Sequence, residues 1–300
     1  MSDVAAATAT ATTLDLRGRT LELSCHIAVM AIVNRTPDSF YDHGRTDSLD
    51  AAVAAGLAAA DAGADIVDVG GVKFAPGPPV SIDEEIARVV PVVAALAPRV
   101  PVSVDTFHPE VAQAAIAAGA AMINDTTGLS NPAMADVVAG SGAAIVIAHS
   151  LATPRTQHPL PQYDDVVDEV REFLRAQVAL ARERGVPTDR IVIDPGHDLN
   201  KNTRHSLELT RRLAEFADLG MPMLVALSNK DFVGEALGRE PDDRMPGSLA
   251  AAVFCALQGA RIVRAHNVRE TVDAMRMVEA IVGWREPACE RHNTRPEGNT

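Results

Sequence analysis

Short runs of apolar residues that end abruptly in polar residues recur along this chain. In Arg190–Gly196, the β-branched run Ile191–Ile193 stops at Asp194, and a Pro-Gly pair follows. A run of this kind is typical of a strand that is buried on both faces of a parallel sheet. The acid then lies at the carboxyl end of the strand, which is the end where parallel α/β proteins bind ligands.

Eight such runs predict eight strands. They are Ile27–Asn34, Ile66–Gly70, Val102–Asp105, Met122–Asp125, Ala144–His149, Ile191–Asp194, Met223–Ser228 and Arg261–His266. Helical stretches lie between them, and a glycine shortly before most of the strands can end the preceding helix. We therefore predict an α/β fold of the (β/α)8 TIM-barrel type. A doubly wound sheet would also explain the alternation, but no G-x-G-x-x-G motif follows the first strand.

The barrel is expected to be a single domain over residues 14–283. Leu14–Leu23 alternates around the turn signal Arg17-Gly18-Arg19, which predicts a short N-terminal hairpin at the barrel floor. Residues 1–13 are expected to form a disordered tail, and residues 284–300 a polar C-terminal tail. Glu235–Gly247 is charged and is interpreted as a surface insertion before the seventh helix.

The side chains at the predicted strand ends include a set of hydrogen-bond acceptors. Asp105, Asn124 and Asp194 suit a planar heterocycle rich in N–H donors, such as a 2-amino-4-oxo pyrimidine ring. Lys230 can donate to the carbonyl of that ring. The carboxyl ends of parallel strands meet at one rim, so these groups are expected to share one cavity.

A second set of strand-end side chains is cationic. Arg264 and His266 can bind a phosphate or diphosphate, and Lys201 is a further candidate for this patch. Asn34 can add an oxygen ligand for Mg²⁺, which takes few protein ligands when substrate phosphates supply the others.

Each of these residues also has a structural interpretation. Asp194 before Pro-Gly can cap a turn, and His149 and His266 can be core histidines, the interpretation that we favour for His149. Asp125 can cap the following turn, and Asp68 can be a structural acid. The convergence of several groups on one rim favours a ligand site. No histidine or cysteine spacing typical of zinc occurs, and a G-x-S-x-G elbow is also absent from the sequence.

Composition narrows the possible partners. The formal net charge of −13 argues against nucleic acid or an anionic membrane, because binding either one requires a basic surface. No apolar run is long enough for a membrane span. The three cysteines, Cys25, Cys255 and Cys289, lack C-x-x-C spacing, which favours reduced thiols in a cytoplasmic protein.

Seven motifs resemble those of dihydropteroate synthase, over roughly residues 14–282. They are Asn34-Arg35-Thr36-Pro37-Asp38-Ser39-Phe40, Asp68-Val69-Gly70-Gly71, Ser103-Val104-Asp105-Thr106, Ile123-Asn124-Asp125, Ile193-Asp194-Pro195-Gly196, Ser228-Asn229-Lys230 and Arg264-Ala265-His266. The family joins 6-hydroxymethyl-7,8-dihydropterin diphosphate to p-aminobenzoate and releases pyrophosphate.

The resemblance implies a role for each strand-end group. Asp105, Asn124, Asp194 and Lys230 would hold the pterin, and Arg264 and His266 the diphosphate, with Mg²⁺ assisted by Asn34. Lys230, Arg264 and His266 would then be the catalytic residues. The acceptor would be p-aminobenzoate or a sulfonamide-like analogue. Family members are commonly homodimers formed through carboxyl-terminal helices, and the Ala-rich stretch Leu249–Leu257 is compatible with such an interface.

The loops depart from the family pattern. In the second loop, Phe74 and Ala75 replace the usual Thr and Arg, and Lys73 is not an equivalent fork donor. In the sixth, Asp198-Leu199-Asn200-Lys201 replaces Gly-Phe-Gly-Lys, which removes an aromatic wall and stiffens a glycine hinge. In the seventh loop, Asn229 and Asp231 stand where Arg and Ser are usual. The first loop carries Arg35, Tyr41 and His43 at positions that are usually smaller or apolar.

These changes favour a diverged paralogue that is weak or inactive in the family reaction. Two or three lost contacts, each worth about 2 to 4 kcal/mol of transition-state stabilisation, would nearly silence it. An active synthase is the alternative, with Lys73 and Arg35 supplying the lost charge. A pterin-dependent methyltransferase is a third hypothesis, against which Arg264 and His266 argue.

Overall fold

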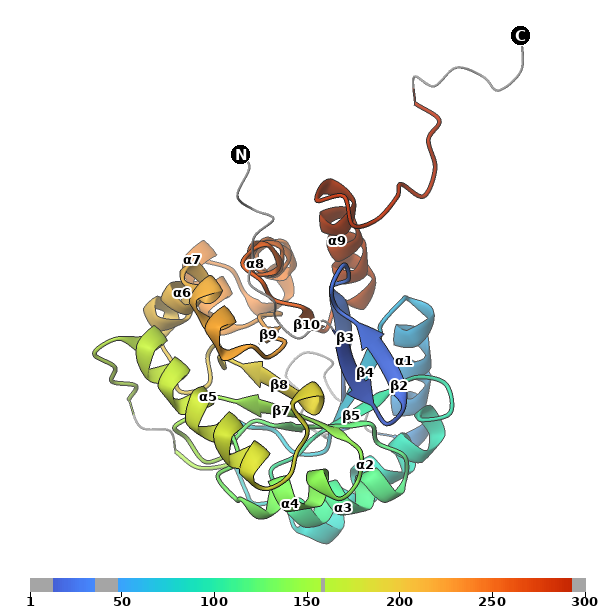
Figure 1. Cartoon of the computed structure of the whole chain (residues 1–300), viewed down its shortest axis with the longest axis vertical. Coiled ribbons are helices and arrows are strands. Elements are labelled where there is room, and N and C mark those ends of the chain that lie inside the picture. The colour runs from blue at the N-terminus through green and yellow to red at the C-terminus, as the bar shows by residue number, and fades with distance from the viewer. Residues whose placement is uncertain (1–12, 36–47, 158–159, 293–300) are drawn as a thin grey trace.

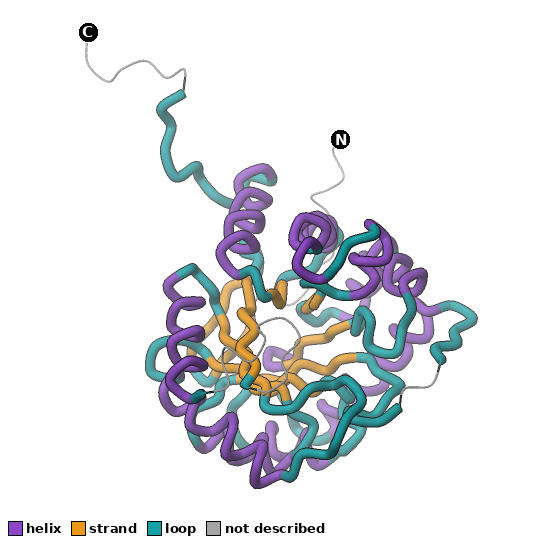
Figure 2. The backbone as a smooth tube through the Cα atoms, turned by 180° about the vertical axis from the view of Figure 1, so that it is seen from behind, coloured by secondary structure: helices purple, strands orange, loops and turns teal. Residues whose placement is uncertain are grey.

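The computed structural model describes residues 13–35, 48–157 and 160–292 of the chain. Within these residues, eight parallel strands form one sheet in the order β8-β7-β6-β5-β4-β3-β10-β9. The two end strands meet at a parallel bridge between Ile193 and Met223, which brings the sheet close to a full barrel. Helices surround the ring of strands (Figures 1 and 2). The predicted TIM barrel is confirmed.

The barrel strands follow the apolar runs closely. They are β3 Ala28–Asn34, β4 Ile66–Gly70, β5 Val102–Asp105, β6 Met122–Asp125, β7 Ala144–Ala148, β8 Ile191–Asp194, β9 Leu224–Ala226 and β10 Ile262–Ala265. The largest difference is in β9, which ends at Ala226 although the sequence predicts strand up to Ser228. Beyond it, Asn229 adopts a left-handed backbone with φ of 58°, which begins the turn into the next helix.

Helices cover the outside of the barrel. They are α1 Leu49–Asp61, α2 Ile82–Leu96, α3 Pro109–Ala117, α4 Ala133–Ala139, α5 Val166–Glu183, α6 Thr203–Arg211, α7 Asp231–Leu237, α8 Met245–Leu257 and α9 Val268–Ile281. Short 3-10 turns span Thr188–Arg190, Leu213–Leu219 and Pro241–Asp243.

The interpretation of Glu235–Gly247 as a surface insertion is wrong at both of its ends. Helix α7 continues to Leu237 and stops at Gly238, whose φ of 63° is left-handed, and α8 begins at Met245. Arg244 connects the two helices, because its Nη1 donates to the carbonyl of Asn229 and to Asp231 Oδ1, at 2.9 Å each.

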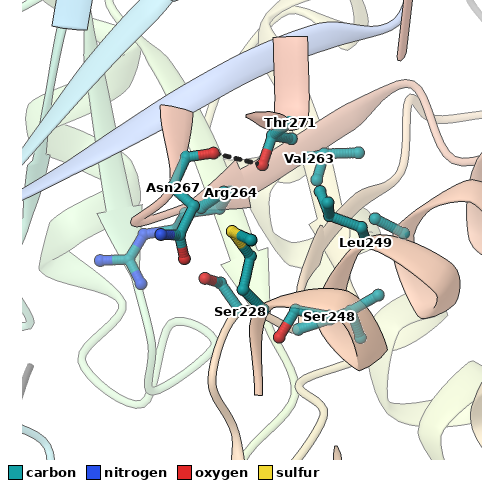
Figure 3. Close-up of a pocket in the computed structure, with 11 residues that line it drawn as sticks. Ser228, Ser248, Leu249, Val263, Arg264, Asn267 and Thr271 are labelled. Carbon is teal, nitrogen blue, oxygen red and sulfur yellow. Dashed lines mark hydrogen bonds between the residues drawn. The ribbon is translucent and has the colours of Figure 1, made fainter. Parts of the chain in front are cut away.

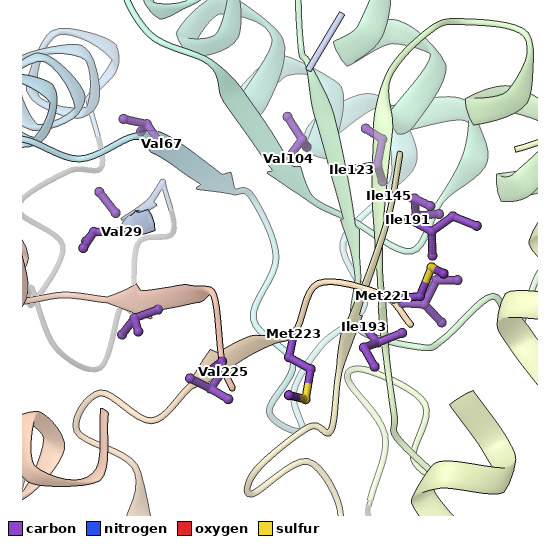
Figure 4. Close-up of a cluster of buried hydrophobic side chains, with 14 of the residues drawn as sticks. Val29, Val67, Val104, Ile123, Ile145, Ile191, Ile193, Met221, Met223 and Val225 are labelled. Carbon is purple, nitrogen blue, oxygen red and sulfur yellow. The ribbon is translucent and has the colours of Figure 1, made fainter. Parts of the chain in front are cut away.

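Two hydrophobic cores hold the barrel. The outer core lies between the strands and helices and contains the outward-facing side chains of the strands, such as Val67, Val104, Ile145 and Val225 (Figure 4). The inner core is a separate cluster of residues that alternate with them along the strands. It is composed of Leu14, Leu16, Leu23, Ala28, Met30, Ile66, Ala121, Met122, Ala144, Val146, Val192, Leu224, Ala226 and Ile262.

The predicted N-terminal hairpin contributes to this inner core. Strands β1 Thr13–Leu16 and β2 Arg19–Glu22 pair antiparallel, and Leu14 and Leu16 pack inside with Leu23. Arg17 Nη1 donates to the carbonyl of Ile116 at 2.8 Å, which fixes the hairpin tip to the end of α3. The hairpin therefore closes the floor, so any ligand must enter from the carboxyl ends of the strands.

The sequence predicts tails over residues 1–13 and 284–300. Thr13 belongs to β1, and residues 1–12 and 293–300 lie outside the described residues. Residues 285–292 follow α9 without helix or strand. In the parts of the chain that the structure describes, no helix is long and apolar enough to cross a membrane.

An ionic cluster ties α9 to the barrel floor. His26 Nδ1 lies 2.8 Å from Glu279 Oε1, and His26 Nε2 lies 3.0 Å from Asp65 Oδ1. Glu279 also accepts from the Ile27 amide and lies 3.6 Å from Arg285. The hydrogen bond and charge of Asp65, with the charge of Glu279, outweigh burial and raise the pKa of His26 above its usual 6.5.

The stabilisation that His26 provides should decrease as the pH rises. A pKa raised by folding adds stability that is fully present below the unfolded value and is lost as the pH rises through the folded value. We expect the difference in unfolding free energy between the wild type and His26→Gln to shrink from about pH 6 to about pH 9, measured by urea denaturation. A difference that stays constant over this range would contradict the assignment.

Candidate functional site

One cavity of about 310 Å³ opens at the carboxyl ends of the strands. Its lining residues come from seven of the eight strands, all except β7, or from the loops that follow them. They are Ile32, Asn34, Val72, Lys73, Phe74, Ala75, Asp105, Asn124, Thr126, Asp194, Leu199, Ala226, Ser228, Asn229, Lys230, Arg264 and His266. The predicted acceptors, the two predicted cations and Asn34 therefore share one opening.

A charged network lies at the floor of this cavity. Arg264 on β10 donates from Nε to Asp68 Oδ2 at 2.7 Å and from Nη2 to Asp105 Oδ2 at 3.0 Å. Asp68 is fully buried and the Arg264 side chain is only 15% exposed. The pairing keeps Arg264 charged inside the barrel, since two nearby carboxylates offset the cost of its burial.

The same network orients Asn124. Its Nδ2 donates to Asp68 Oδ2 at 3.1 Å. Because a carboxylate can only accept hydrogen bonds, the amide nitrogen must face Asp68, and the amide oxygen is left as an acceptor for a ligand in the cavity. Asp68 is thus a central residue of the site, whereas the sequence suggested only a structural acid.

Burial changes the acid–base properties of the two cavity acids. It raises the pKa of Asp105 to about 7, because the charge of Arg264 only partly opposes the loss of solvent and the charge of Asp68 adds to the rise. Burial also raises the pKa of Asp194, against the charge of Lys230 and a 2.7 Å hydrogen bond from the Gly196 amide. Near neutral pH, Asp105 can therefore accept or donate a hydrogen bond.

Lys230 is held at the start of α7, close to the sixth loop. Its Nζ donates to the carbonyl of His197, and burial lowers its pKa, although the charges of Asp198 and Asp194 oppose this effect. His266 follows β10, and its amide donates to Ser228 Oγ at 3.2 Å. Both residues line the cavity, as the sequence predicted.

Lys201 does not join the cationic patch. Its Nζ lies under the sixth loop, where it donates to the carbonyls of Gly196 and Leu199 at 3.0 Å each and contacts His149 Nδ1 at 2.8 Å. Burial and the charge of Lys201 lower the pKa of His149 to about 2, so the imidazole is neutral. The interpretation of His149 as a core histidine with satisfied contacts agrees with this arrangement.

Arg35, at the start of the first loop, contacts α2 and is not among the residues that line the cavity. Arg35 Nη1 donates to the carbonyls of Ala87 and Arg88 on α2, at 3.1 and 2.8 Å. Pro91 has no N–H to donate to Ala87, so Arg35 supplies the missing hydrogen bond. The other two altered residues of this loop, Tyr41 and His43, lie outside the described residues.

A much smaller cavity lies behind β10, between β9 and α8. Its volume of about 10 Å³ suits a single water molecule at most. In Figure 3, the guanidinium of Arg264 points away from Ser248 and Leu249, toward the barrel interior. The carbonyl of Asn267 accepts from Thr271 Oγ1 at 2.7 Å beside it. This cavity therefore belongs to the packing around the site.

A nearly closed TIM barrel with these acceptors and cations at its strand ends has an opening suited to a polar ligand. A family model described as "Pterin binding enzyme" matches residues 30–266. The chain belongs to the pterin-binding enzyme family.

The chain is similar to curated proteins that include the following two. Dihydropteroate synthase of Escherichia coli K12 is 43% identical over 273 residues, which cover 90% of this chain and 96% of the relative. "Inactive dihydropteroate synthase 2" of Mycobacterium tuberculosis H37Rv is 47% identical over 267 residues, which cover 86% of this chain and 84% of the relative. Among solved structures, Xanthomonas albilineans dihydropteroate synthase with 4-aminobenzoic acid matches with a TM-score of 0.84 and 42% identity, covering 90% and 98% of the two chains.

The network makes a prediction for Asp68→Asn. Removing one partner of a buried ion pair leaves the other charge uncompensated, so we expect a loss of about 3 kcal/mol in unfolding free energy. The pKa of Asp105 should also fall from about 7, because the charge of Asp68 raises it. Denaturant unfolding and a carboxyl-carbon NMR titration measure the two effects.

Asp125→Asn is the matched control. Asp125 is equally buried on β6, but it accepts from the amides of Thr127 and Leu129 and so caps a local turn. Its charge also raises the pKa of Asp105, but less than that of Asp68 does. We expect the smaller pKa change in this variant; an equal or larger one would refute the central place of Asp68.

Proposed function

We propose that the protein binds 6-hydroxymethyl-7,8-dihydropterin diphosphate and catalyses its condensation with p-aminobenzoate weakly or not at all. One observation carries this proposal: Asp105, Asn124, Asp194 and Lys230 line the same 310 Å³ cavity as Arg264 and His266. The first set has the hydrogen-bonding groups for an aminopyrimidinone ring, and the second has the charge for a diphosphate.

The proposed binding of the pterin ring depends on the hydrogen-bond donors and acceptors that line the cavity. The Asn124 oxygen and the Asp194 carboxylate accept from ring N–H groups, and Lys230 donates to the ring carbonyl. Asp105, with its pKa near 7, can bond to either a donor or an acceptor at the ring edge. Because the ring is buried when bound, each unmatched polar atom would cost affinity, which favours a ligand with this donor pattern.

The diphosphate would lie toward Arg264 and His266. Asn34 on β3 lines the same cavity. Gly70 leaves room beside Asn34 Oδ1, because a β-carbon at position 70 would lie only 3.0 Å from that oxygen. A single amide oxygen fits Mg²⁺ only when phosphate oxygens complete the coordination, so Asn34 would hold the ion together with substrate. When bound, Mg²⁺ would add positive charge that helps the diphosphate leave.

In the family reaction, the bond between the pterin methylene and the diphosphate oxygen breaks, and pyrophosphate leaves with the electron pair. The amine nitrogen then bonds to the methylene and loses a proton. The protein's contribution is placement and charge neutralisation. A protein that retains the pterin-binding groups but has few cations available for the diphosphate would bind the pterin and catalyse the reaction slowly.

Three cations at or near this cavity are already engaged by other groups of the protein. Arg264 is already paired with Asp68 and Asp105, Lys201 is buried under its loop, and Arg35 Nη1 is bonded to α2. Phe74 and Ala75 line the cavity where the family has Thr and Arg. These contacts support low activity.

An active synthase is the second candidate, and Lys73 favours it. Lys73 lines the cavity beside Phe74, so its charge can act on a diphosphate there. Identity does not decide between the two candidates, because the chain is 43% identical to a synthase and 47% identical to a relative described as inactive. A pterin-dependent methyltransferase needs no diphosphate site, and the shared cavity with Arg264 and His266 argues against it.

The acceptor that we propose is p-aminobenzoate or a sulfonamide-like analogue. The Xanthomonas albilineans structure that matches this chain contains 4-aminobenzoic acid. In this chain, the side chains of Phe74 and Leu199 supply apolar lining that can contact an aryl ring, so the acceptor would bind between the second and sixth loops.

We also propose that the protein acts in the cytoplasm. Cys25, Cys255 and Cys289 are all free, and Cys25 and Cys289 are exposed. Exposed free thiols suit a reducing compartment, where disulfides do not form readily.

Calorimetry with the pterin tests the binding proposal directly. We expect wild-type protein to bind pterin diphosphate, and Asp194→Ala to bind it about 10- to 100-fold more weakly, because a buried charge-assisted contact is lost. Asp189→Ala is the matched control, since Asp189 is exposed near the opposite end of β8. Unchanged affinity in Asp194→Ala would show that the pocket is assigned incorrectly.

Pyrophosphate release tests the activity proposal. With p-aminobenzoate and Mg²⁺, we expect little amine-dependent release by the wild type. The double variant Phe74→Thr/Ala75→Arg should release about 10- to 100-fold more, because it restores one hydroxyl and one cation facing the ligand. Rapid turnover by the wild type would instead establish the second candidate.

We further propose that the protein is a homodimer. Large apolar side chains are exposed on α8 and α9, namely Phe254, Leu257, Met277 and Ile281. A second copy of the chain would bury them. We expect sedimentation to show a dimer and Phe254→Glu to shift it to monomer, whereas Leu160→Glu, on an exposed residue after the fifth strand, should not. A monomeric wild type would contradict this proposal.

A further inference from the structure

A buried lysine, Lys201, holds the sixth loop from its inner side. Lys201 is only 7% exposed, and it is not among the residues that line the ligand cavity. Four acceptors surround its Nζ: His149 Nδ1 at 2.8 Å and the carbonyls of Gly196, Leu199 and His149 at 3.0, 3.0 and 3.3 Å. An ammonium group has three N–H donors, so these acceptors can satisfy all of them.

The contacts of Lys201 connect the ends of two neighbouring strands. His149 follows β7, and its amide donates to the carbonyl of Asp194, at the end of β8, at 2.9 Å. Gly196 has a left-handed φ of 70°, and a β-carbon at this position would lie 2.1 Å from the carbonyl oxygen of His149. Glycine therefore lets the sixth loop approach His149 closely enough for one ammonium group to contact both.

Residues 196–199 form a turn that a second lysine also contacts. The Leu199 amide donates to the carbonyl of Gly196 at 3.0 Å, which closes the turn. Lys201 donates to the carbonyls of residues 196 and 199, and Lys230 Nζ donates to the carbonyl of His197, which lies between them. Lys230 lines the ligand cavity. The two lysines are therefore connected through the backbone of one short turn.

The side chain of Asp198 attaches the same turn to the neighbouring helices. It accepts from Ser206 Oγ on α6 at 2.9 Å and from the Phe232 amide on α7 at 3.2 Å. The peptide units of the turn are thus fixed by Asp198 on one side and by Lys201 on the other. Loss of Lys201 would remove two of the carbonyl contacts that fix the orientation of the His197 carbonyl.

We propose that Lys201 is a positioning residue for Lys230. It fixes the turn whose His197 carbonyl orients the Lys230 ammonium group, and it thereby determines where that group meets the carbonyl of a bound pterin ring. The inference rests on the proposed function, in which Lys230 donates to this ring. Lys201 itself makes no contact with the ligand, because its donors are engaged by His149 and the turn.

The charge of Lys201 offers a second route to the ligand, which the test has to separate from the first. Burial raises the pKa of Asp194, and the charges of Lys230 and Lys201 oppose this rise. Asp194 lines the cavity and is proposed to accept from the ring. Through this route, Lys201 would affect pterin binding even in a protein that lacks the Lys230 side chain.

A double-mutant cycle, measured by calorimetry with pterin diphosphate, separates the two routes. We expect Lys201→Met to weaken binding about 10-fold in the wild-type background but less than about twofold in the Lys230→Met background, because its effect runs through Lys230. Lys230→Met should retain measurable binding, since the acceptors of the cavity are unchanged. An equal loss in both backgrounds, or no loss in the wild-type background, would overturn the proposal.

The pH dependence of the same affinities tests whether the ammonium group is responsible. Burial lowers the pKa of Lys201 to about 7, although the charge of Asp194 opposes this effect. Above this pH, the neutral amine has only two N–H donors for its four acceptors. We expect the advantage of the wild type over Lys201→Met to fall from about 10-fold near pH 6 to about threefold or less near pH 8.5. A constant ratio would show that Lys201 acts by packing alone, which would overturn the proposal.

The comparison at each pH cancels most of the other titrations. The titratable groups around Lys201 are present in both proteins, and they are His149, Tyr163, Asp194, His197, Asp198, His205 and Lys230. Asp105, whose pKa is raised to about 7, is also common to both.

Tyr163→Phe is the matched control. Tyr163 Oη donates to the carbonyl of Asn200 at 3.1 Å, so this variant removes a hydrogen bond to the sixth loop outside residues 196–199. We expect its pterin affinity to stay within about twofold of the wild type. A tenfold loss would show that any change in the loop weakens binding, and it would overturn the specific role of Lys201.

Folding and the proposed function are checked separately. Urea denaturation shows whether Lys201→Met is folded; if it is not, Lys201→Gln, which retains N–H donors without the charge, replaces it in the cycle. Pterin binding by the wild type is measured first. Its absence contradicts the proposed function itself, whereas normal wild-type binding with an equal loss in both backgrounds contradicts the role of Lys201 alone.

Discussion

The ion pairs of Arg264 with Asp68 and Asp105 are the interaction on which the ligand end of the barrel depends. The partners lie on β10, β4 and β5, and Arg264 and Asp68 are 196 residues apart in the sequence. Burying these charges is costly unless all three are present, because any one alone would be an uncompensated charge in a low-dielectric interior. The network therefore forms only when the barrel has closed with its strands in register.

The network also limits what the site can do chemically. Arg264 lines the cavity, yet two carboxylates already share it. If a diphosphate binds as proposed, it would compete with Asp105 for the guanidinium. The pKa of Asp105 near 7 would ease this exchange, because protonation of Asp105 would weaken its hold on Arg264. Binding of the anion and proton uptake by Asp105 would then be coupled through one side chain.

The sequence predicted the barrel well because strand positions depend on local hydrophobicity. Each apolar run predicts a strand without knowledge of its neighbours. The polar residue at the end of the run then lies at the carboxyl end of the barrel. Asp194 and Arg264 were found in this way. Helix α7 was missed because it has only 7 residues and the charged segment Arg239–Arg244 follows it. The contacts by which Arg244 holds the start of α7 exist only when α7 and α8 are packed together.

The roles of individual polar side chains were harder to predict, because they depend on partners distant in sequence. Asp68 lies in the middle of β4, and Lys201 lies in the loop between β8 and α6. Asp68 points into the barrel toward Arg264, whereas Lys201 turns under its own loop toward carbonyls. No local signal identifies the partners of either side chain. Period-two alternation from Ile66 would have placed Asp68 inside the barrel, but not its partner.

The altered sixth loop shows how the site can change while the fold remains the same. Asp198 and Asn200 replace the family's glycines and have φ values of 62° and 53°, the left-handed conformation that glycine adopts without strain. Asp and Asn are the residues that tolerate this region best, at a cost of about 1 kcal/mol each. The loop can therefore retain a glycine-like path while its side chains differ. Asp198 uses its carboxylate to accept from Ser206 Oγ at 2.9 Å and from the Phe232 amide at 3.2 Å, which stabilises the loop in return. Substitutions in this loop therefore change the side chains beside the cavity, whereas the backbone conformation can stay the same.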